Sequence, residues 1–152
     1  MMRTISLLLL SLCFLTGFKN PVMTGLRENY NKTVADKKLC ENTIRELRTL
    51  KNMSPTQLAY LGGLQAIWAN HVFNPIDKLG TFNKGKKNIE RAIFLEPNNI
   101  ELRFIRLSIQ KNTPSFLGYK SNIKEDTILI MEHRKMISSE ILIKNIDTLL
   151  KN

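Results

Sequence analysis

The spacing of apolar side chains predicts helices along most of the chain. In the polar segment 26–52 they recur at Tyr30, Val34, Leu39, Cys40, Ile44, Leu47 and Leu50. This spacing places them on one face of an amphipathic helix. No segment alternates between apolar and polar residues with the period that marks a half-buried strand. We therefore expect no β-sheet.

Prolines and their neighbours divide the rest of the chain. Ser54 is a typical N-cap, and Pro55 is typical of a first helical turn. The segment 58–73 carries no formal charge and is apolar around nearly its whole circumference, which predicts a central, buried helix. Asn74-Pro75 ends it, because the residue before a proline avoids the helical region. Small residues on this helix would let another helix approach closely: Ala59, Gly62, Ala66 and Ala69.

Four further helices are expected towards the C-terminus. They cover residues 76–95, 99–111, 124–134 and 139–150. Asn98 and Glu101 have the spacing of a capping pair for the second of these. The sequence thus predicts an all-α chain, a small antiparallel stack of helical hairpins with five to six helices.

One stretch resembles a known repeat family. In the run 82–102, Gly85, Ile89, Ala92 and Pro97 occupy the small, large, small and proline positions of a tetratricopeptide repeat. The resemblance ends upstream, where the expected Trp, Leu, Gly and Tyr are replaced by Ala69, Val72, Phe73 and Ile76. It implies a tetratricopeptide-like hairpin. Residues 60–119 also resemble a group of uncharacterised small exported bacterial proteins, which implies a fold and a compartment but no activity.

The first residues have the pattern of a signal peptide. Arg3 precedes an uncharged run over residues 5–18, which is shorter than the roughly 20 apolar residues of a membrane span. We expect a signal peptide at 1–18, cleaved near Gly17, a linker at 19–25 and one helical domain at 26–152. This predicts export to the periplasm or cell envelope. Leu12 stands where a lipoprotein would need a small residue before Cys13, so no lipid anchor is expected.

Little in the mature sequence points to metal or cofactor chemistry. Cys40 would be its only cysteine, so neither an internal disulfide nor a cysteine metal cluster is expected. A structural place on an amphipathic helix suits Cys40 better than a reactive one. The sequence contains no HExxH spacing and no glycine-rich phosphate loop. We expect no metal and no cofactor.

The charge is strongly positive for a chain of globular composition. The 152 residues are 43% hydrophobic, and 23 Lys and Arg against 13 Asp and Glu give a formal net charge of +10. Such an excess raises the question of nucleic acid or an anionic membrane surface. A/T-rich codons for Lys, Asn and Ile could supply part of it. An exported protein seldom meets nucleic acid, so we expect no such partner; membrane-surface contact through Lys84, Lys87 and Arg91 stays open.

A polar stripe on the predicted helix 99–111 is the main candidate for a binding site. At about 100° per residue it collects four side chains between two apolar rows: Asn99, Arg103, Arg106 and Gln110. A helix flanked in this way is wedged between two neighbours. Arg103 and Arg106 then either line a groove that binds carboxylates, or form structural ion pairs with Glu90, Glu96 or the final helices.

The remaining candidates are Lys86, His71, Phe116 and Tyr119. Lys86 lies within an apolar arc, where it would extend along its neighbours or pair with Glu90. His71 falls in the last turn of its helix, a place suited to binding terminal carbonyls. Phe116 and Tyr119 would cover the end of the hairpin or form the lip of a binding site.

Two functions from different classes follow. The first is a non-enzymatic module of the cell envelope that binds a protein or peptide through Arg103, Arg106 and the 116–119 loop. The alternative is a small enzyme or ligand carrier with a pocket around His71, Lys86, Arg103 and Arg106. The identity of the partner and the oligomeric state stay open.

Overall fold

Helices are the only regular elements of the computed structural model, which describes residues 20–151. The seven α-helices are α1 (Pro21–Asn29), α2 (Lys37–Arg48), α3 (Pro55–Trp68), α4 (Pro75–Leu95), α5 (Ile100–Asn112), α6 (Ile123–His133) and α7 (Glu140–Lys151). The all-α prediction is confirmed, with one or two more helices than expected. Within the described residues no helix is long and apolar enough to cross a membrane. The predicted signal peptide at 1–18 lies outside them.

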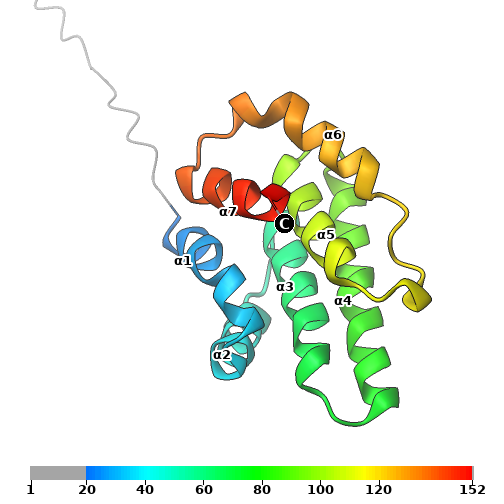
Figure 1. The fold of residues 1–152 in the computed structure, drawn as a ribbon. Coiled ribbons are helices and arrows are strands. Elements are labelled where there is room, and N and C mark those ends of the chain that lie inside the picture. The colour runs from blue at the N-terminus through cyan, green and yellow to red at the C-terminus, as the bar shows by residue number, and fades with distance from the viewer. Residues whose placement is uncertain (1–19, 152) are drawn as a thin grey trace, which may run out of the picture.

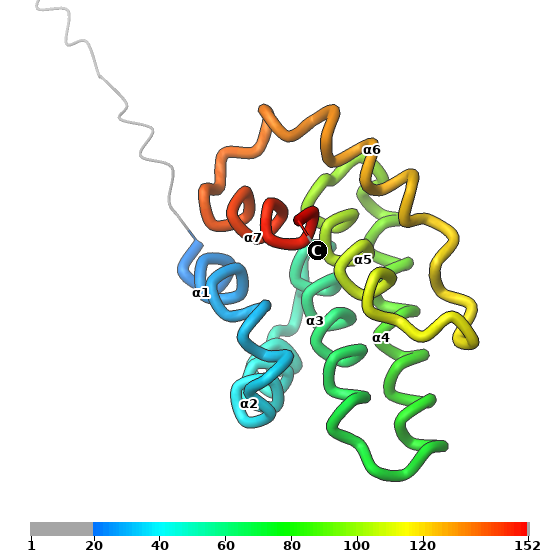
Figure 2. The backbone as a smooth tube through the Cα atoms, in the orientation of Figure 1, coloured from blue at the N-terminus to red at the C-terminus, as the bar shows by residue number. Residues whose placement is uncertain are grey.

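The long antiparallel hairpin of α3 and α4 is the centre of the molecule (Figure 1). The other helices are arranged around it. α2 and α5 both pack against α3, and α6 lies along α5. α7 returns to contact α1 and α5, so the first and last helices of the described chain are neighbours (Figure 2). The core follows this arrangement, with α3 and α5 buried over most of their circumference.

The single helix expected over residues 26–52 is wrong, because two α-helices and a 3₁₀ segment occupy this stretch. The 3₁₀ segment Tyr30–Val34 follows α1, and Asp36 then starts α2 by accepting a hydrogen bond from the Leu39 N–H (2.8 Å). An aspartate at an N-cap favours a new helix start over continuation. α1 itself begins at Pro21, so residues 21–25 are helical where a linker was expected.

The predicted helix start at Ser54 is confirmed. The Ser54 hydroxyl accepts a hydrogen bond from the Gln57 N–H, and the Gln57 side chain accepts one from the Ser54 N–H, which completes a capping box. The predicted cap of α5 is off by one residue. Asn99, not Asn98, accepts the bond from the Glu101 N–H (3.0 Å). The Glu101 side chain is turned into the core, as described below.

The close approach predicted for the small residues of α3 is confirmed. A Cβ atom on Gly62 would lie 2.6 Å from the carbonyl oxygen of Gly85 on α4. A Cβ on Gly85 would lie 2.5 Å from the Gly62 oxygen and 2.7 Å from the Ala66 nitrogen. The backbones of α3 and α4 are therefore in direct contact at this level, and only glycine fits at either position.

Candidate functional site

Arg103 and Arg106 of the predicted stripe form a buried network with carboxylates. Arg106 donates from Nε to Asp126 Oδ2 and from Nη2 to Asp126 Oδ1, both at 2.7 Å. Arg103 Nη1 donates to the same Asp126 Oδ1 (3.0 Å) and to Glu125 Oε1 (2.8 Å). Arg106 Nη1 also reaches Glu90 Oε2 at 3.0 Å. The network thereby joins α4, α5 and α6.

The environment of these groups fits a structural role. Asp126 is fully buried and Arg106 nearly so. Burial disfavours the charged Arg106 guanidinium, but the hydrogen bonds and charges of Asp126 and Glu90 together outweigh this, so the pKa of Arg106 lies above its ordinary value. Arg103 additionally donates to the carbonyl of Pro97 (2.8 and 3.0 Å), which ties down the turn before α5. Of the two alternatives for the arginines, the structure shows the ion pairs.

Two other predicted site residues near this network, Gln110 and Tyr119, also form side-chain hydrogen bonds, whereas Phe116 is exposed. Gln110 is fully buried, and its Nε2 donates to Asn122 Oδ1 (3.3 Å). Tyr119 is buried and donates its hydroxyl proton to Glu90 Oε1 (2.6 Å). Burial and the Glu90 carboxylate raise the pKa of Tyr119 well above its ordinary value. Phe116, in contrast, is 86% exposed.

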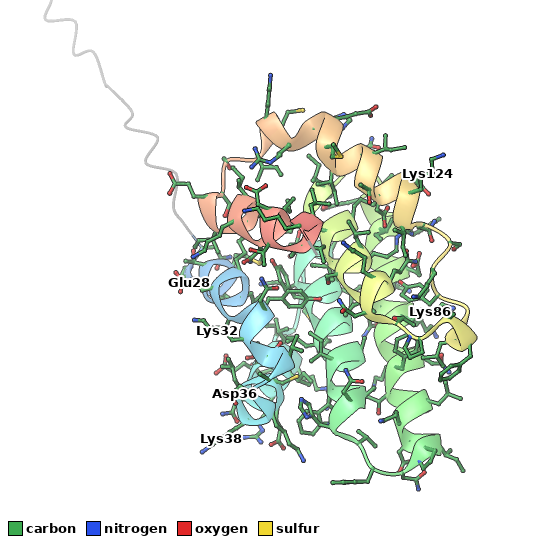
Figure 3. The ribbon with its side chains drawn as sticks, viewed as in Figure 1. Glu28, Lys32, Asp36, Lys38, Lys86 and Lys124 are labelled. Carbon is green, nitrogen blue, oxygen red and sulfur yellow. The ribbon has the colours of Figure 1, made fainter. Side chains whose placement is uncertain are left out.

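Lys86 and His71 do not join the arginines in a pocket. The Lys86 ammonium lies 5.0 Å above the Tyr119 ring, a cation–π contact on the outside of the network. Figure 3 shows Lys86 at the periphery of the bundle. His71 lies beyond the end of α3 against the Trp68 ring, 5.6 Å between centroids. Neither side chain lines either of the two cavities described below.

A second ion-pair cluster was not predicted. Arg27 of α1 donates two hydrogen bonds to Glu101 (2.7 and 2.8 Å), and the Tyr60 hydroxyl donates to the same carboxylate at 2.8 Å. This fixes α1 against α3 and α5. The hydrogen bond to Glu101 raises the pKa of Arg27. The sequence offered no signal for it, since a glutamate in a first helical turn is accounted for by the helix dipole.

A cavity lies on another part of the hairpin. It is a groove of about 720 Å³ between α2, α3 and α4, which we call the α2–α4 groove. Gln65 and Trp68 of α3 form its floor. Its walls are formed by Glu41, Ile44, Arg45 and Arg48 on α2 and by Ile76, Asp77, Gly80, Thr81 and Lys84 on α4. A second cavity of about 390 Å³ lies between α1 and α2.

The groove floor contains an unpaired donor. Gln65 is buried, and its Oε1 accepts a hydrogen bond from the Asn88 Nδ2 (2.8 Å). Its Nε2 is also buried but has no partner among the described residues. A buried amide donor without an acceptor costs about 1–3 kcal/mol, and a ligand oxygen would reach this donor only if the Gln65 side chain turned towards the groove. Beside it, the Lys37 ammonium lies over the half-buried Trp68 ring, 5.5 Å from the ring centroid.

The groove walls have a surplus of positive charge. Arg45 pairs with Glu41 one turn away on α2 (3.5 Å). Arg48 on α2 and Lys84 on α4 are exposed, and neither has a carboxylate within ion-pair distance among residues 20–151. Two cations thus face solvent on opposite walls of a groove with an aromatic floor. This arrangement fits a ligand that carries carboxylates.

Cys40 has the structural role that the sequence suggests. It is fully buried on α2, and its thiol donates to the Leu64 carbonyl (Sγ–O 3.5 Å). Burial raises the pKa of Cys40 to about 11. Among the described residues no cluster of His, Cys, Asp and Glu could hold a metal ion.

The raised pKa predicts that Cys40 is unreactive in the folded protein. At pH 8 we expect Cys40 to react with an aromatic disulfide reagent at least about 100-fold more slowly than in denaturant. Because the unfolded thiol ionises first, Cys40 contributes stability below the ordinary thiol pKa that is lost as the pH rises towards 11. Fast labelling under native conditions would contradict the burial of Cys40.

No family model, curated protein or solved structure matches this chain. What the molecule does is therefore argued from its own surface.

Proposed function

We propose that this chain is a non-enzymatic interaction module that binds an acidic peptide segment of a partner protein in the α2–α4 groove. The two exposed cations on opposite walls of the groove, Arg48 and Lys84, carry this proposal, and the unpaired Gln65 donor on the groove floor supports it. The predicted export would place the module in the cell envelope. The partner segment would present carboxylates to Arg48 and Lys84 and an oxygen acceptor to Gln65.

The arrangement of the helices supports a groove of this kind. A tetratricopeptide-like hairpin, as proposed from the run 82–102, is a unit of repeat proteins, in which stacked helical hairpins form concave binding surfaces. Gly85 and Ala92 of that run are buried, as the small positions of such a repeat require. α2 packs beside α3 and supplies the second wall.

The arginine stripe supports the module indirectly. Because Arg103 and Arg106 are already neutralised by Asp126, Glu90 and Glu125, they have little to offer an incoming carboxylate. Their network instead holds α4 against α5 and α6, and so fixes the side of the α3–α4 hairpin that faces α5. The binding function is therefore assigned to the α2–α4 groove, where Arg48 of α2 and Lys84 of α4 have no carboxylate partner among the described residues.

Selection from a displayed library of random peptides tests the proposal. We expect enriched peptides to be rich in Asp and Glu and to compete with one another for the full chain. Arg48→Glu together with Lys84→Glu should weaken their binding at least about tenfold, since each replaces attraction by repulsion. Lys87→Glu with Arg91→Glu changes the net charge equally, on exposed positions of α4 outside the groove, and should weaken binding much less.

Gln65→Leu provides an independent check, because it removes the unpaired donor without changing the charge. It should reduce peptide binding while changing thermal stability little, because the loss of the hydrogen bond from Asn88 offsets the removal of an unpaired buried donor. Equal losses in the groove variant and in the Lys87/Arg91 control would show that binding follows net charge alone. Failure to enrich any peptide that the groove variant loses would refute the groove as the binding site.

A further inference from the structure

Two large apolar side chains stand fully in solvent at the turn between α3 and α4. Phe73 is 97% exposed and Ile76 is 81% exposed. Leu79, one turn further along α4, is also exposed. We call residues 72–79 the hairpin tip. Figure 1 shows it as the lowest point of the molecule, beyond the ends of the neighbouring helices.

The convex shape of the hairpin tip differs from that of a protein-binding surface. The residues that dominate protein interfaces are enclosed by pockets on the partner and sit in broad complementary surfaces. Phe73 instead projects from a convex apex, and it does not line the α2–α4 groove. Apolar side chains that project beyond a folded surface suit a medium that closes around them, such as the boundary between lipid headgroups and acyl chains.

Charged residues around the hairpin tip favour an anionic surface. Lys78 lies within the tip, and Lys37 of α2 lies over the ring of Trp68, 5.5 Å from its centroid, at the end of α3 that leads into the tip. Both lysines are exposed, and the tip itself contains one exposed acid, Asp77. Lysine stems extend past apolar neighbours and place their ammonium groups among lipid phosphates.

From this geometry we propose that the hairpin tip docks the protein on an anionic lipid surface, with Phe73 and Ile76 entering the headgroup region and the nearby lysines contacting phosphates. The tip shares Ile76 and Asp77 with the wall of the α2–α4 groove, whereas Phe73 does not line the groove, so a change at Phe73 separates the two roles. The formal net charge of +10 adds a long-range attraction to an anionic surface, whichever way the protein is turned.

Co-sedimentation with vesicles tests the proposal. The full chain should bind vesicles of phosphatidylcholine and phosphatidylglycerol, bind phosphatidylcholine alone weakly, and lose affinity as salt is added. Phe73→Ser should weaken binding roughly tenfold, because it removes a large apolar side chain from the lipid. Phe116→Ser is the matched control, since Phe116 is also highly exposed, on a turn elsewhere. It should bind as the parent does.

Fluorescence adds a readout of depth. Trp68 is the only tryptophan, so Phe73→Trp in a Trp68→Phe background places the sole indole at the hairpin tip. Its emission should shift to the blue on phosphatidylglycerol vesicles and be quenched by brominated acyl chains. Vesicle binding that is unchanged by Phe73→Ser, or an indole that stays in water, would overturn the proposal and leave the tip to a protein partner. Absence of vesicle binding by the parent would overturn it as well.

Discussion

Asp126→Asn should destabilise the fold more than any other single charge removal in the described chain. Asp126 is fully buried and accepts from both Arg103 and Arg106. Removing the charge leaves two buried guanidinium groups facing a neutral amide. Breaking one partner of a buried ion pair costs about 3–5 kcal/mol. This is a large fraction of the roughly 5–15 kcal/mol by which domains are stable. Urea unfolding followed by helical circular dichroism measures the loss.

Glu125→Gln is the matched control for this prediction. Glu125 precedes Asp126 on α6 and accepts from the same Arg103 at 2.8 Å, but more than half of its side chain is in water. Hydrogen bonds from Asn122 and Arg103 lower the pKa of Glu125, so its contribution is present above its ordinary pKa and lost as the pH falls. Exposed pairs contribute about 0–1 kcal/mol. If Asp126→Asn costs no more than Glu125→Gln, the network does not hold α6 in place.

The helices could be predicted from the sequence because their signals are local. Apolar periodicity and the N-cap at Ser54 depend on residues within a few positions of each other. The helix start at Ser54 is confirmed, and periodicity predicted the helices except over residues 26–52. The N-cap signal at Asp36 is equally local. The apolar side chains keep a helical spacing on both sides of Asp36, however, so this spacing does not reveal that one helix ends and another begins there. Where an N-cap residue interrupts a continuous pattern, the pattern alone favours one helix over two.

The pairing of the arginine stripe was less predictable. A helix with apolar rows on both sides of two arginines must be wedged between neighbours, which the structure bears out. Its main partner is Asp126, which in the sequence has the ordinary place of an acid in a first helical turn. Only the packing of α6 on α5 brings it to the arginines. The α2–α4 groove was missed for the same reason, because its residues come from three helices.

The two buried ion-pair clusters hold the helices together, and the proposed binding surfaces lie on other parts of the molecule. Arg27, Glu101 and Tyr60 fix α1 to the core, and the Asp126 network fixes α6 and α4. Both clusters are centred on residues of α5, which packs against α3 and α4. The groove and the hairpin tip lie on parts of this hairpin that the clusters leave uncovered. Their geometry then depends on how closely α3 and α4 pack.

Gly85→Ala tests that packing, and we expect it to destabilise the protein by about 2 kcal/mol, as overpacked sites do. The new methyl group would meet backbone atoms of Gly62 and Ala66 at 2.5–2.7 Å, which cannot rotate away, so α3 and α4 must separate. Urea denaturation measures the change. Because both walls of the groove rest on this contact, peptide affinity should fall with it.

Gly80→Ala supplies the control with the opposite sign. Gly80 lies in the same helix, and nothing lies within 4 Å of a Cβ built there. Alanine is favoured over glycine in a helix interior by about 1 kcal/mol, so this variant should be more stable than the parent. The pair separates helix propensity from close packing within one helix. If Gly85→Ala were as stabilising as Gly80→Ala, the direct backbone contact between α3 and α4 would be refuted, and with it the geometry on which the groove depends.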